Sequence, residues 1–514
     1  MTSLALAPMM VLTASAVVST IVGNRSIRLR NAVISCSFAS AILVNTYFFI
    51  TSLGGAFDYA KLGELTVNAA SICISELVLI LGFLGVIYSY SYIEERAETW
   101  AYYLLYQLFT AMMIGMVSSF NILVIYTFLE VSSVTSAVLV MFSRRRSSIL
   151  AAYRYLALSI FGGVIIIGGI FYQYQLTHAL NLADLSGLGQ AEVNILSTLY
   201  LLGFGIKAGL LPFGPLWLPP AHSEAPIPIH TLLSAALVQV AAFDIARILG
   251  STAITNNYVA SLLLTVGLAS MLAGSSYALV EAWFGSKYTR FHVGPRDIRG
   301  IKRVWAFSTI SEVGYISTFL GLAGILASHG FGYEEALVLG FGGAMLHMYN
   351  HGLAKSQLLF DSGVMIKMGL AEDLNLMGGL SSRLSSMKIS FTVGALSLGL
   401  LPGTFGVMTL RELVFNSGIP GLIRMVVIAT AGISLVACLS VWFRAFFSKV
   451  EHDFDDHLSV PRSMYLPGLL AAGAMIVFGA YFTLEWVGFV SSGSGLTSAL
   501  RILAETTIKT KAGL

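Results

Sequence analysis

Long apolar runs, separated by short polar connections, follow one another along almost the whole chain. Many of them reach about eighteen residues, which is enough for a helix to cross the hydrocarbon core of a bilayer. We expect spans at roughly 3–22, 31–53, 70–91, 101–119, 121–141, 150–172, 194–212, 228–250, 258–284, 304–328, 335–366, 387–413, 420–446 and 463–490. The pattern predicts an all-α polytopic membrane protein, with about 14 transmembrane helices in a single membrane domain over residues 1–514.

The composition strengthens this interpretation. Of the 514 residues, 56% are hydrophobic and only 11% are charged, whereas a soluble domain carries about 25% charged residues. The three cysteines, Cys36, Cys73 and Cys438, all fall in apolar runs and form no Cys-x-x-Cys pattern. The sequence therefore indicates a lipid bilayer as the surroundings. It gives no sign of nucleic acid as a partner, or of a structural zinc site or an iron–sulfur cluster in this chain.

Basic residues are distributed unevenly over the connections between the spans. Loops that we expect on one membrane face carry most of them, including the run at residues 144–146, whereas Lys61 is one of few on the opposite face. Loops rich in Lys and Arg stay on the cytoplasmic side of a membrane. Because the number of spans is even, this bias predicts that both termini lie on the outer side of the membrane. The membrane expected is the inner or plasma membrane of a cell.

Two apolar spans are interrupted by similar sequences. "GLLPFG" at residues 209–214 and "GLLPGTFG" at residues 399–406 place Pro212 and Pro402 inside spans. Proline removes a backbone donor and breaks a helix, and neighbouring glycines loosen it further. Two broken helices in corresponding positions are typical of transporters built from repeats, with the ion path at the breaks. Chance is the alternative explanation in a chain with 50 glycines.

Ionisable residues occur in the middle of several spans. Glu130 lies in "NILVIYTFLEVSSV", Lys207 in "LLGFGIKAGLLPFG" and Glu312 in "AFSTISEVGYIS". Such a side chain costs about 2.5–3.5 kcal/mol at the bilayer centre, so each is a candidate for function. Glu130 has no basic residue within helical reach, so we expect it to carry a proton or to face a cation from another helix. A movable Glu–Lys pair can switch a lysine between holding and releasing a proton.

A third group of titratable residues lies in "HMYNHGLAKSQLLF". His347, His351 and Lys355 are spaced four apart, so on a helix they form one stripe, with Asn350 close by. Neutral imidazoles donate and accept hydrogen bonds at once, which is what a chain of proton transfers needs. The spacing predicts a proton-conducting stripe along one helix face.

Two structural explanations stay open for these groups. Each polar side chain, taken singly, could bind one helix to another without moving an ion. A histidine pair at i, i+4 could also bind zinc, but Lys355 follows His347 and His351, and no Asp, Glu or Cys lies beside them. We therefore predict no metal site, and for the whole set we favour a path for protons or small cations.

Four segments carry a family resemblance. "LHMYNHGLAKSQLLFDSGVMI" is similar to "H…NHALFKALLFLSAGAVI", and "DIRGIKRVWAFSTISEVGY" to "DIKRLLAYSSISHIGY". "AAYRYLALSIFGG" is similar to "EAALKYLVLGSIGS", and "AHSEAPIPIHTLLSAALV" to "AHSAAPTPVSALLSGLLV". Over residues 101–413 the chain thus resembles the Mrp-antiporter-like membrane subunits. This family occurs in respiratory complex I, in membrane-bound energy-converting hydrogenases and in Mrp cation/proton antiporters.

The resemblance implies two inverted five-helix repeats, residues 101–250 (helices 4–8) and 256–447 (helices 9–13). A last helix and a short tail follow at residues 448–514. It also implies that the seventh and twelfth helices are broken, and that Glu130 in the fifth helix pairs with Lys207 in the seventh. His347, His351 and Lys355 would belong to a central relay that passes protons laterally through the subunit.

Two positions depart from the family pattern. Gln239, in "LVQVAAFD", replaces a lysine of the eighth helix, and Leu410, in "GVMTLRE", replaces the Lys or Glu that follows the second break. Arg411 and Glu412 come next, but one or two residues turn a helix by about 100–200°, and arginine is a poor proton carrier. Either Glu412 takes over, or the subunit couples incompletely, or it moves another cation. Glu312 stands where the family often has His or Gln and is a candidate for compensation.

The resemblance implies an ion-translocating subunit, for protons or sodium ions, in a multisubunit redox-driven complex. The chain has no redox or hydrolytic site of its own, so iron–sulfur clusters, and a NiFe centre or quinone, are expected in partner subunits. The expected partners are other membrane subunits, homologous antiporter-like subunits among them, and indirectly peripheral redox subunits. The alternatives are a subunit of an Mrp-type Na⁺/H⁺ antiporter without redox partners and a scaffold that has lost transport. A stand-alone symporter fits least, because the family works in assemblies.

Overall fold

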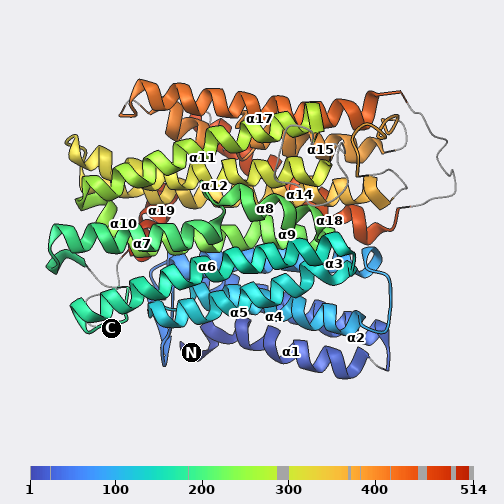
Figure 1. The fold of residues 1–514 in the computed structure, drawn as a ribbon, viewed down its shortest axis with the longest axis horizontal. Coiled ribbons are helices and arrows are strands. Elements are labelled where there is room, and N and C mark those ends of the chain that lie inside the picture. The colour runs from blue at the N-terminus through green and yellow to red at the C-terminus, as the bar shows by residue number, and fades with distance from the viewer. Residues whose placement is uncertain are drawn as a thin grey trace.

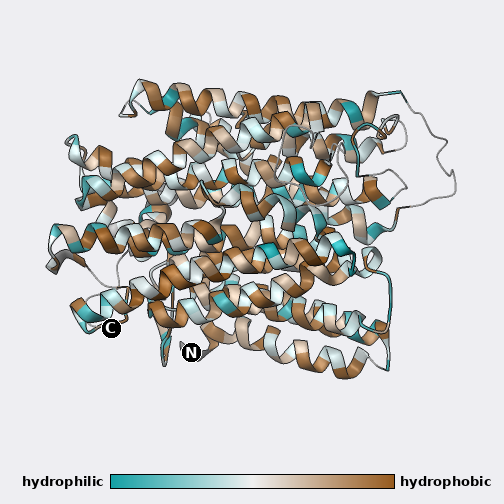
Figure 2. Ribbon diagram, in the orientation of Figure 1, coloured by the Kyte–Doolittle hydropathy of each residue, from teal (hydrophilic) through white to brown (hydrophobic). Residues whose placement is uncertain are grey.

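The computed structural model describes residues 2–23, 25–182, 185–285, 300–367, 372–381, 384–416, 418–449, 460–487 and 494–508. The described residues are almost all helical, and the long helices lie roughly parallel in one layered bundle, with α1 and α17 at opposite edges (Figure 1). Apolar residues dominate these helices (Figure 2). The all-α polytopic architecture is therefore confirmed.

The elements follow the expected spans in order. The first part of the chain contains η1 (Thr2–Leu6), α1 (Ala7–Gly23), α2 (Ile27–Leu53), β1 (Tyr59–Leu62), β2 (Leu65–Asn68), α3 (Ala69–Tyr92), α4 (Thr99–Val117), α5 (Ile122–Val140), η2 (Met141–Ser143), α6 (Arg146–Thr177), η3 (Leu185–Gly187), α7 (Gln190–Ala208), α8 (Gly214–Glu224), α9 (Ile227–Leu232), η4 (Leu233–Leu237) and α10 (Val238–Thr255).

The second part contains α11 (Asn257–Phe284), α12 (Ile301–Ser328), α13 (Tyr333–Leu337), η6 (Val338–Gly342), α14 (Gly343–Lys367), α15 (Ser385–Leu398), α16 (Val407–Leu410), η7 (Arg411–Phe415), α17 (Gly421–Phe447), α18 (Arg462–Trp486) and α19 (Ser494–Ile508). The segments η4, η6 and η7 are π-helical turns. Such turns inside α-helices occur frequently at functional sites.

Among the described residues, 11 helices are long and apolar enough to cross a membrane. The other three expected spans coincide with regions that are interrupted: α7–α8, α13–α14 and α15–η7. Large apolar side chains on α2, α6, α17 and α18 point outward, as at Leu43, Phe171, Leu422 and Val477. The central helices are different, because Ile227–Gly250 and most of α12 are buried. The bundle thus presents apolar side chains to lipid and keeps its polar groups inside.

The first break separates α7 from α8 at the position expected from Pro212. Gly209 adopts a left-handed conformation with φ +82°, and a Cβ on Gly214 would lie only 1.9 Å from the Gly209 carbonyl oxygen. Two contacts satisfy freed backbone groups, because Trp217 Nε1 donates to Ile206 O (2.8 Å) and Leu211 N donates to Ser270 Oγ (3.0 Å). Interrupted backbone within a membrane protein requires such partners.

The second break lies between α15 and α16, where Pro402 was expected to end a helix. Leu400 and Gly403 have φ values of +59° and +85°, and Gly406 N donates to Ser397 Oγ at 3.3 Å. Both predicted breaks are therefore present. The inverted relationship of residues 101–250 and 256–447 stays a prediction.

One helix was not expected from the apolar pattern. The segment expected as a tail contains α19, which packs on α3, α10 and η6. Its Thr506 accepts a hydrogen bond from Asn68 Nδ2 through the carbonyl oxygen (2.7 Å) and one from Ala70 N through Oγ1 (3.2 Å). The helix therefore supplies acceptors at the start of α3. Polar residues such as Arg501 and Glu505 keep this segment from matching the pattern of an apolar span, so it was expected only as a short tail.

The close approach at the first break generates a prediction. Replacing Gly214 by alanine forces the chain apart at the Gly209 carbonyl, so we expect the free energy of unfolding to fall by about 1–3 kcal/mol, as for an overpacked core site. Thermal unfolding of the purified chain in detergent measures this. The control is Gly168→Ala in α6, where a Cβ meets no atom within 4 Å. Equal unfolding temperatures for the two variants would contradict the prediction.

Candidate functional site

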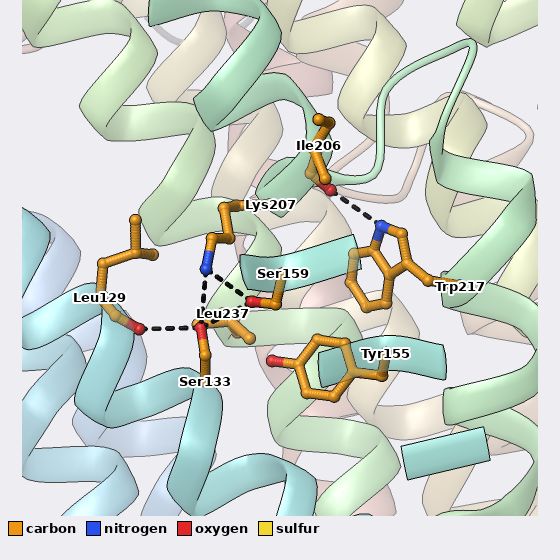
Figure 3. Close-up of a pocket in the computed structure, with 8 residues that line it drawn as sticks. All are labelled: Leu129, Ser133, Tyr155, Ser159, Ile206, Lys207, Trp217 and Leu237. Carbon is orange, nitrogen blue, oxygen red and sulfur yellow. Dashed lines mark hydrogen bonds between the residues drawn. The ribbon is translucent and has the colours of Figure 1, made fainter. Parts of the chain in front are cut away.

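A buried ion pair joins three helices in the first half of the chain. Lys207 Nζ, near the end of α7, lies 2.8 Å from Glu130 Oε1 on α5. The same ammonium donates to Ser133 Oγ (3.0 Å) on α5 and to Ser159 Oγ (2.5 Å) on α6. Figure 3 shows the lysine extended toward these two hydroxyl groups. The structure thus places a cation from another helix opposite Glu130, which is one of the two possibilities that the sequence left open.

Local packing explains this geometry. Glu130 and Ser133 are three residues apart and share one face of α5, and a Cβ on Gly163 of α6 would lie 2.5 Å from Glu130 Oε1. Only a glycine therefore leaves room for the carboxylate between α5 and α6. The side chain of Lys207 is 4% exposed and that of Glu130 is 24% exposed. The carboxylate lies at the edge of the bundle, whereas the amine lies inside it.

A small cavity adjoins Lys207. It is lined by Leu129, Ser133, Tyr155, Ser159, Ile206, Lys207, Trp217 and Leu237 and measures about 10 Å³. That is room for about one water molecule. Tyr155 and Trp217 have ring centroids 5.0 Å apart and form one side of the cavity (Figure 3). The lysine has polar neighbours within an otherwise apolar surrounding.

The second cluster lies between α12 and α14. Glu312 Oε2 on α12 lies 3.2 Å from His347 Nε2 and 4.0 Å from His351 Nδ1 on α14. All three side chains are fully buried. His347 Nδ1 also lies 2.9 Å from Thr409 Oγ1, which belongs to α16 just beyond the second break. The polar chain thus runs from α12 through α14 to the broken helix.

Hydrogen bonding defines the proton position on one imidazole. His351 Nε2 lies 2.9 Å from the Ser234 carbonyl oxygen, which can only accept, so Nε2 carries a hydrogen. In the neutral ring, the lone pair of Nδ1 then faces Glu312. His351 can therefore take up a second proton on the side of the carboxylate.

The structure places Lys355 on the same side of α14 as the two histidines. Its ammonium donates to the Trp305 carbonyl oxygen (3.1 Å) and to Ser308 Oγ, both on α12. Asn350 lies on a different face, where Ser397 Oγ of α15 donates to its Oδ1 at 2.6 Å. The predicted stripe of His347, His351 and Lys355 therefore faces α12, and Asn350 is not part of it.

Sequence reasoning missed a second histidine pair. His222 at the end of α8 and His230 in α9 are fully buried, and their ring centroids are 4.9 Å apart. Trp217 of the Lys207 cavity contacts the His222 ring at 5.9 Å, and α9 packs on α14. No hydrogen-bond partner among the described residues reaches the four ring nitrogens. His222 fell in the proline-rich connection between two expected spans and His230 fell at the start of the span expected at 228–250, and only the motif "AHSEAPIPIH" pointed to them.

The two positions that differ from the family pattern lie in different parts of the structure. Gln239 in α10 is fully buried, and neither its amide nitrogen nor its amide oxygen has a hydrogen-bond partner in the described part of the chain. Leu410 ends α16, and Glu412 follows one turn after Thr409. Arg411 Nε lies 3.4 Å from Glu412 Oε1. The second break therefore brings an arginine–glutamate pair, and not a lone lysine, to the end of the polar chain.

Glu412 borders an open cavity of about 510 Å³. Its charged lining residues are Glu334, Glu335, Arg411, Glu412, Glu485 and Arg501. Arg411 Nη1 lies 3.8 Å from Glu485 Oε2, and Arg501 Nη2 on α19 lies 2.5 Å from Glu334 Oε1. This cavity is named the acidic vestibule below, and its lining includes Met408 and Glu412, which are close in sequence to Thr409 at the end of the polar chain.

Metal binding was not expected. In the described part of the chain, no group of three or more His, Cys, Asp or Glu residues could hold a metal ion. Apart from His222 and His230, the histidines, lysines and carboxylates described above are arranged as ion pairs and hydrogen-bonded groups.

Comparison with known sequences gives one family match. The chain matches the family described as "NADH:quinone oxidoreductase/Mrp antiporter, TM" over residues 119–284 and 296–435. It is 30% identical over 382 residues to Na(+)/H(+) antiporter subunit A1 of Staphylococcus haemolyticus, covering 72% of this chain and 44% of that protein. It is 29% identical over 364 residues to NADH-quinone oxidoreductase subunit N of Desulforudis audaxviator, covering 69% and 66%. The chain thus spans about half to two thirds of the length of these relatives.

Solved structures share the fold. A chain of the archaeal membrane-bound sulfane sulfur reductase superposes with a TM-score of 0.77 at 18% identity, covering 97% of both chains. A chain of the Mrp complex from Dietzia sp. gives a TM-score of 0.76 at 20% identity, covering 98% of this chain and 52% of that one. A chain of respiratory complex I from Thermus thermophilus gives 0.69 at 19% identity, covering 95% and 100%.

The burial of Lys207 predicts energetic coupling to Glu130. Glu130→Gln leaves a buried ammonium without its counter-charge, so we expect a loss of about 1–3 kcal/mol in unfolding free energy. Adding Lys207→Met should recover much of that loss, because no charge then remains buried. Thermal unfolding of both single variants and the double variant measures the coupling. The control is Arg144–Glu98, an exposed pair for which we expect no more than about 1 kcal/mol. Additive effects at Glu130 and Lys207 would contradict the prediction.

Proposed function

The chain belongs to the NADH:quinone oxidoreductase/Mrp antiporter transmembrane family, and on that premise we propose that it translocates protons or sodium ions as a subunit of a larger redox-driven complex. The observation that carries the proposal is the buried Lys207–Glu130 pair beside a water-sized cavity. An ion pair that served stability alone would need neither the cavity nor a carboxylate that is 24% exposed. A lysine that exchanges protons needs both.

In the proposed mechanism, the position of Glu130 controls the proton on Lys207. With Glu130 at 2.8 Å, the ammonium is stabilised by the opposite charge and by two serine hydroxyl groups. When the carboxylate moves outward, the ammonium is left buried and unpaired, which is costly. It then gives its proton to a water in the cavity next to Tyr155 and Trp217. The return of Glu130 favours reprotonation.

The second cluster continues the path. His222 and His230 lie between the Lys207 cavity and α14, as their contacts with Trp217 and the packing of α9 on α14 indicate. Protons would then reach Lys355 and His351, and Glu312 stabilises a charged imidazole at either His351 or His347. Rotation of neutral imidazole and hydroxyl groups completes each transfer.

Glu412 takes the place of the missing charge at Leu410 in this proposal. Thr409, whose hydroxyl contacts His347, lies one turn before Glu412, and Glu412 borders the acidic vestibule. A proton leaving His347 therefore has a carboxylate next on its way to the surface. Arg411 holds that carboxylate in place and does not itself carry the proton.

The remaining parts of the function belong to partners. Electron transfer would use iron–sulfur clusters, and a NiFe centre or quinone, in other subunits, with homologous antiporter-like subunits as membrane neighbours. The apolar, outward-facing helices support a multi-pass membrane protein, and its proposed location is the inner or plasma membrane of a cell. The excess of basic residues in one set of loops supports an orientation with both termini outside.

A second function is favoured by the curated relatives. Two of them, from Staphylococcus haemolyticus and Alkalihalophilus pseudofirmus, are named Na(+)/H(+) antiporter subunits. The chain would then work in an Mrp-type antiporter without redox partners. Purification of the native assembly separates the two functions, because only the redox-driven complex contains subunits with nickel or iron–sulfur clusters. A scaffold without transport is the third candidate, favoured by Gln239 and Leu410.

The path predicts the effect of two substitutions. Lys207→Ala and Lys355→Ala each remove a proton-carrying group, so we expect ion translocation by the reconstituted assembly to fall at least about tenfold. Dye-based measurements of proton and sodium ion movement into vesicles test this. Lys388→Ala is the control, because that lysine lies near the start of α15, where it donates to Ser381 Oγ and lies over the Phe447 ring, outside the proposed path. Unchanged translocation in Lys207→Ala, with the assembly intact, would favour the scaffold.

A further inference from the structure

A carboxylate outside the proposed path lies deep in α14. Asp361 is 2% exposed and is six residues from Lys367, the last residue of its helix. At 1.5 Å per residue it lies about 9 Å from the helix end. It is therefore nearer to one membrane face than His347, His351 and Lys355 are. Neither the Lys207 pair nor the histidine stripe uses it.

Three helices enclose this carboxyl group. Gln357 Nε2 donates to Asp361 Oδ2 and, at 3.0 Å, to Ser390 Oγ on α15. A Cβ on Gly468 of α18 would lie 2.7 Å from Asp361 Oδ1. Within the described residues, no Lys, Arg or His forms an ion pair with Asp361. The partners of this buried acid are a carboxamide and a hydroxyl group, which are neutral.

Asp361 belongs to a polar line that is separate from the histidine stripe. Six residues rotate a helix by about 600°, so Asp361 and Lys355 point to different sides of α14. Lys355 contacts Trp305 and Ser308 on α12, whereas Asp361 faces α15 and α18. About three turns before Asp361, Asn350 contacts Ser397 of α15 at the same seam.

This polar line reaches the second helix break. Ser397 Oγ accepts from Gly406 N at 3.3 Å, directly before α16. Between the two ends of the seam, Gln357 Oε1 is buried without a hydrogen-bond partner in the described residues. The seam between α14 and α15 therefore has an acid at one end, the break at the other and an unsatisfied acceptor in between.

The surroundings of Asp361 determine its charge. An ionised carboxylate in an apolar bundle is costly without a cation, and such a group takes up a proton instead. The family motif quoted for this helix has Leu and Ser where this chain has Gln357 and Asp361. The buried acid and its partner Gln357 are thus features in which this chain differs from the family motif.

We propose that Asp361 is a further proton-carrying site, which exchanges a proton between the membrane face where α14 ends and the polar seam between α14 and α15. At rest the carboxyl group is protonated. It releases the proton to water at that membrane face or to the seam, and it is reprotonated from the other side, so no other bond forms or breaks. This role rests on the proposed ion translocation, because the proton it carries serves that process.

The test combines a spectroscopic and a transport measurement on the purified, complete assembly. Infrared difference spectra of wild type against Asp361→Asn should show the loss of one C=O band of a protonated carboxylic acid. Translocation into vesicles should fall at least about tenfold in the same variant. Asp361→Ser, which introduces the residue of the family motif, should give both effects with normal assembly. The control is Ser356→Ala on the same helix, whose hydroxyl donates to Leu353 O and to no other group among the described residues, and it should match wild type.

Each other outcome overturns the inference. An unchanged C=O region means that Asp361 is ionised at rest, and wild-type translocation in both Asp361 variants means that its proton takes no part in transport. Lys207→Ala separates this failure from failure of the proposed function. If Lys207→Ala abolishes translocation while the Asp361 variants do not change it, the translocating function stands and only the role of Asp361 is lost.

Discussion

The cost of an unpaired charge in an apolar bundle is the constraint on which this structure depends. Each buried ionisable group needs an opposite charge, a set of hydrogen bonds or a proton. Lys207 has Glu130 and two serines, His347 and His351 have Glu312, and Asp361 has only neutral partners. The glycines at 163 and 468 leave space for two of these carboxyl groups. The packing of the central helices is therefore inseparable from the placement of their charges.

Much of the fold follows from the sequence because lipid allows few solutions. Apolar runs of sufficient length must be helices, and Pro212 and Pro402 within such runs must interrupt them. The π-helical turns and α19 could not be predicted in this way. A π-helical turn depends on contacts between helices, and α19 is too polar to show a span, although it packs on α3 and η6.

The candidate site was predictable where a motif or a helical period exposed it. The spacing of His347, His351 and Lys355 gave their common face, and the family resemblance gave a cation opposite Glu130. His222 and His230 escaped because His222 lies in a proline-rich connection and His230 in the next expected span, and only the fold of α8 and α9 brings their rings together. The two helix breaks also have different charged residues beside them. The ion-paired Lys207 lies just before the first break, whereas Leu410 follows the second break and Glu412 lines the acidic vestibule.

The central claim is that Lys207 works by giving up its proton, and Lys207→Arg tests it most directly. Arginine keeps the positive charge and the pairing with Glu130, but it does not release a proton at physiological pH. Proton and sodium ion translocation would be measured on the reconstituted assembly, with thermal unfolding as a check that the fold is intact. The account predicts a stable assembly that no longer translocates. Translocation at the wild-type rate in Lys207→Arg would contradict it and would make the ion pair structural.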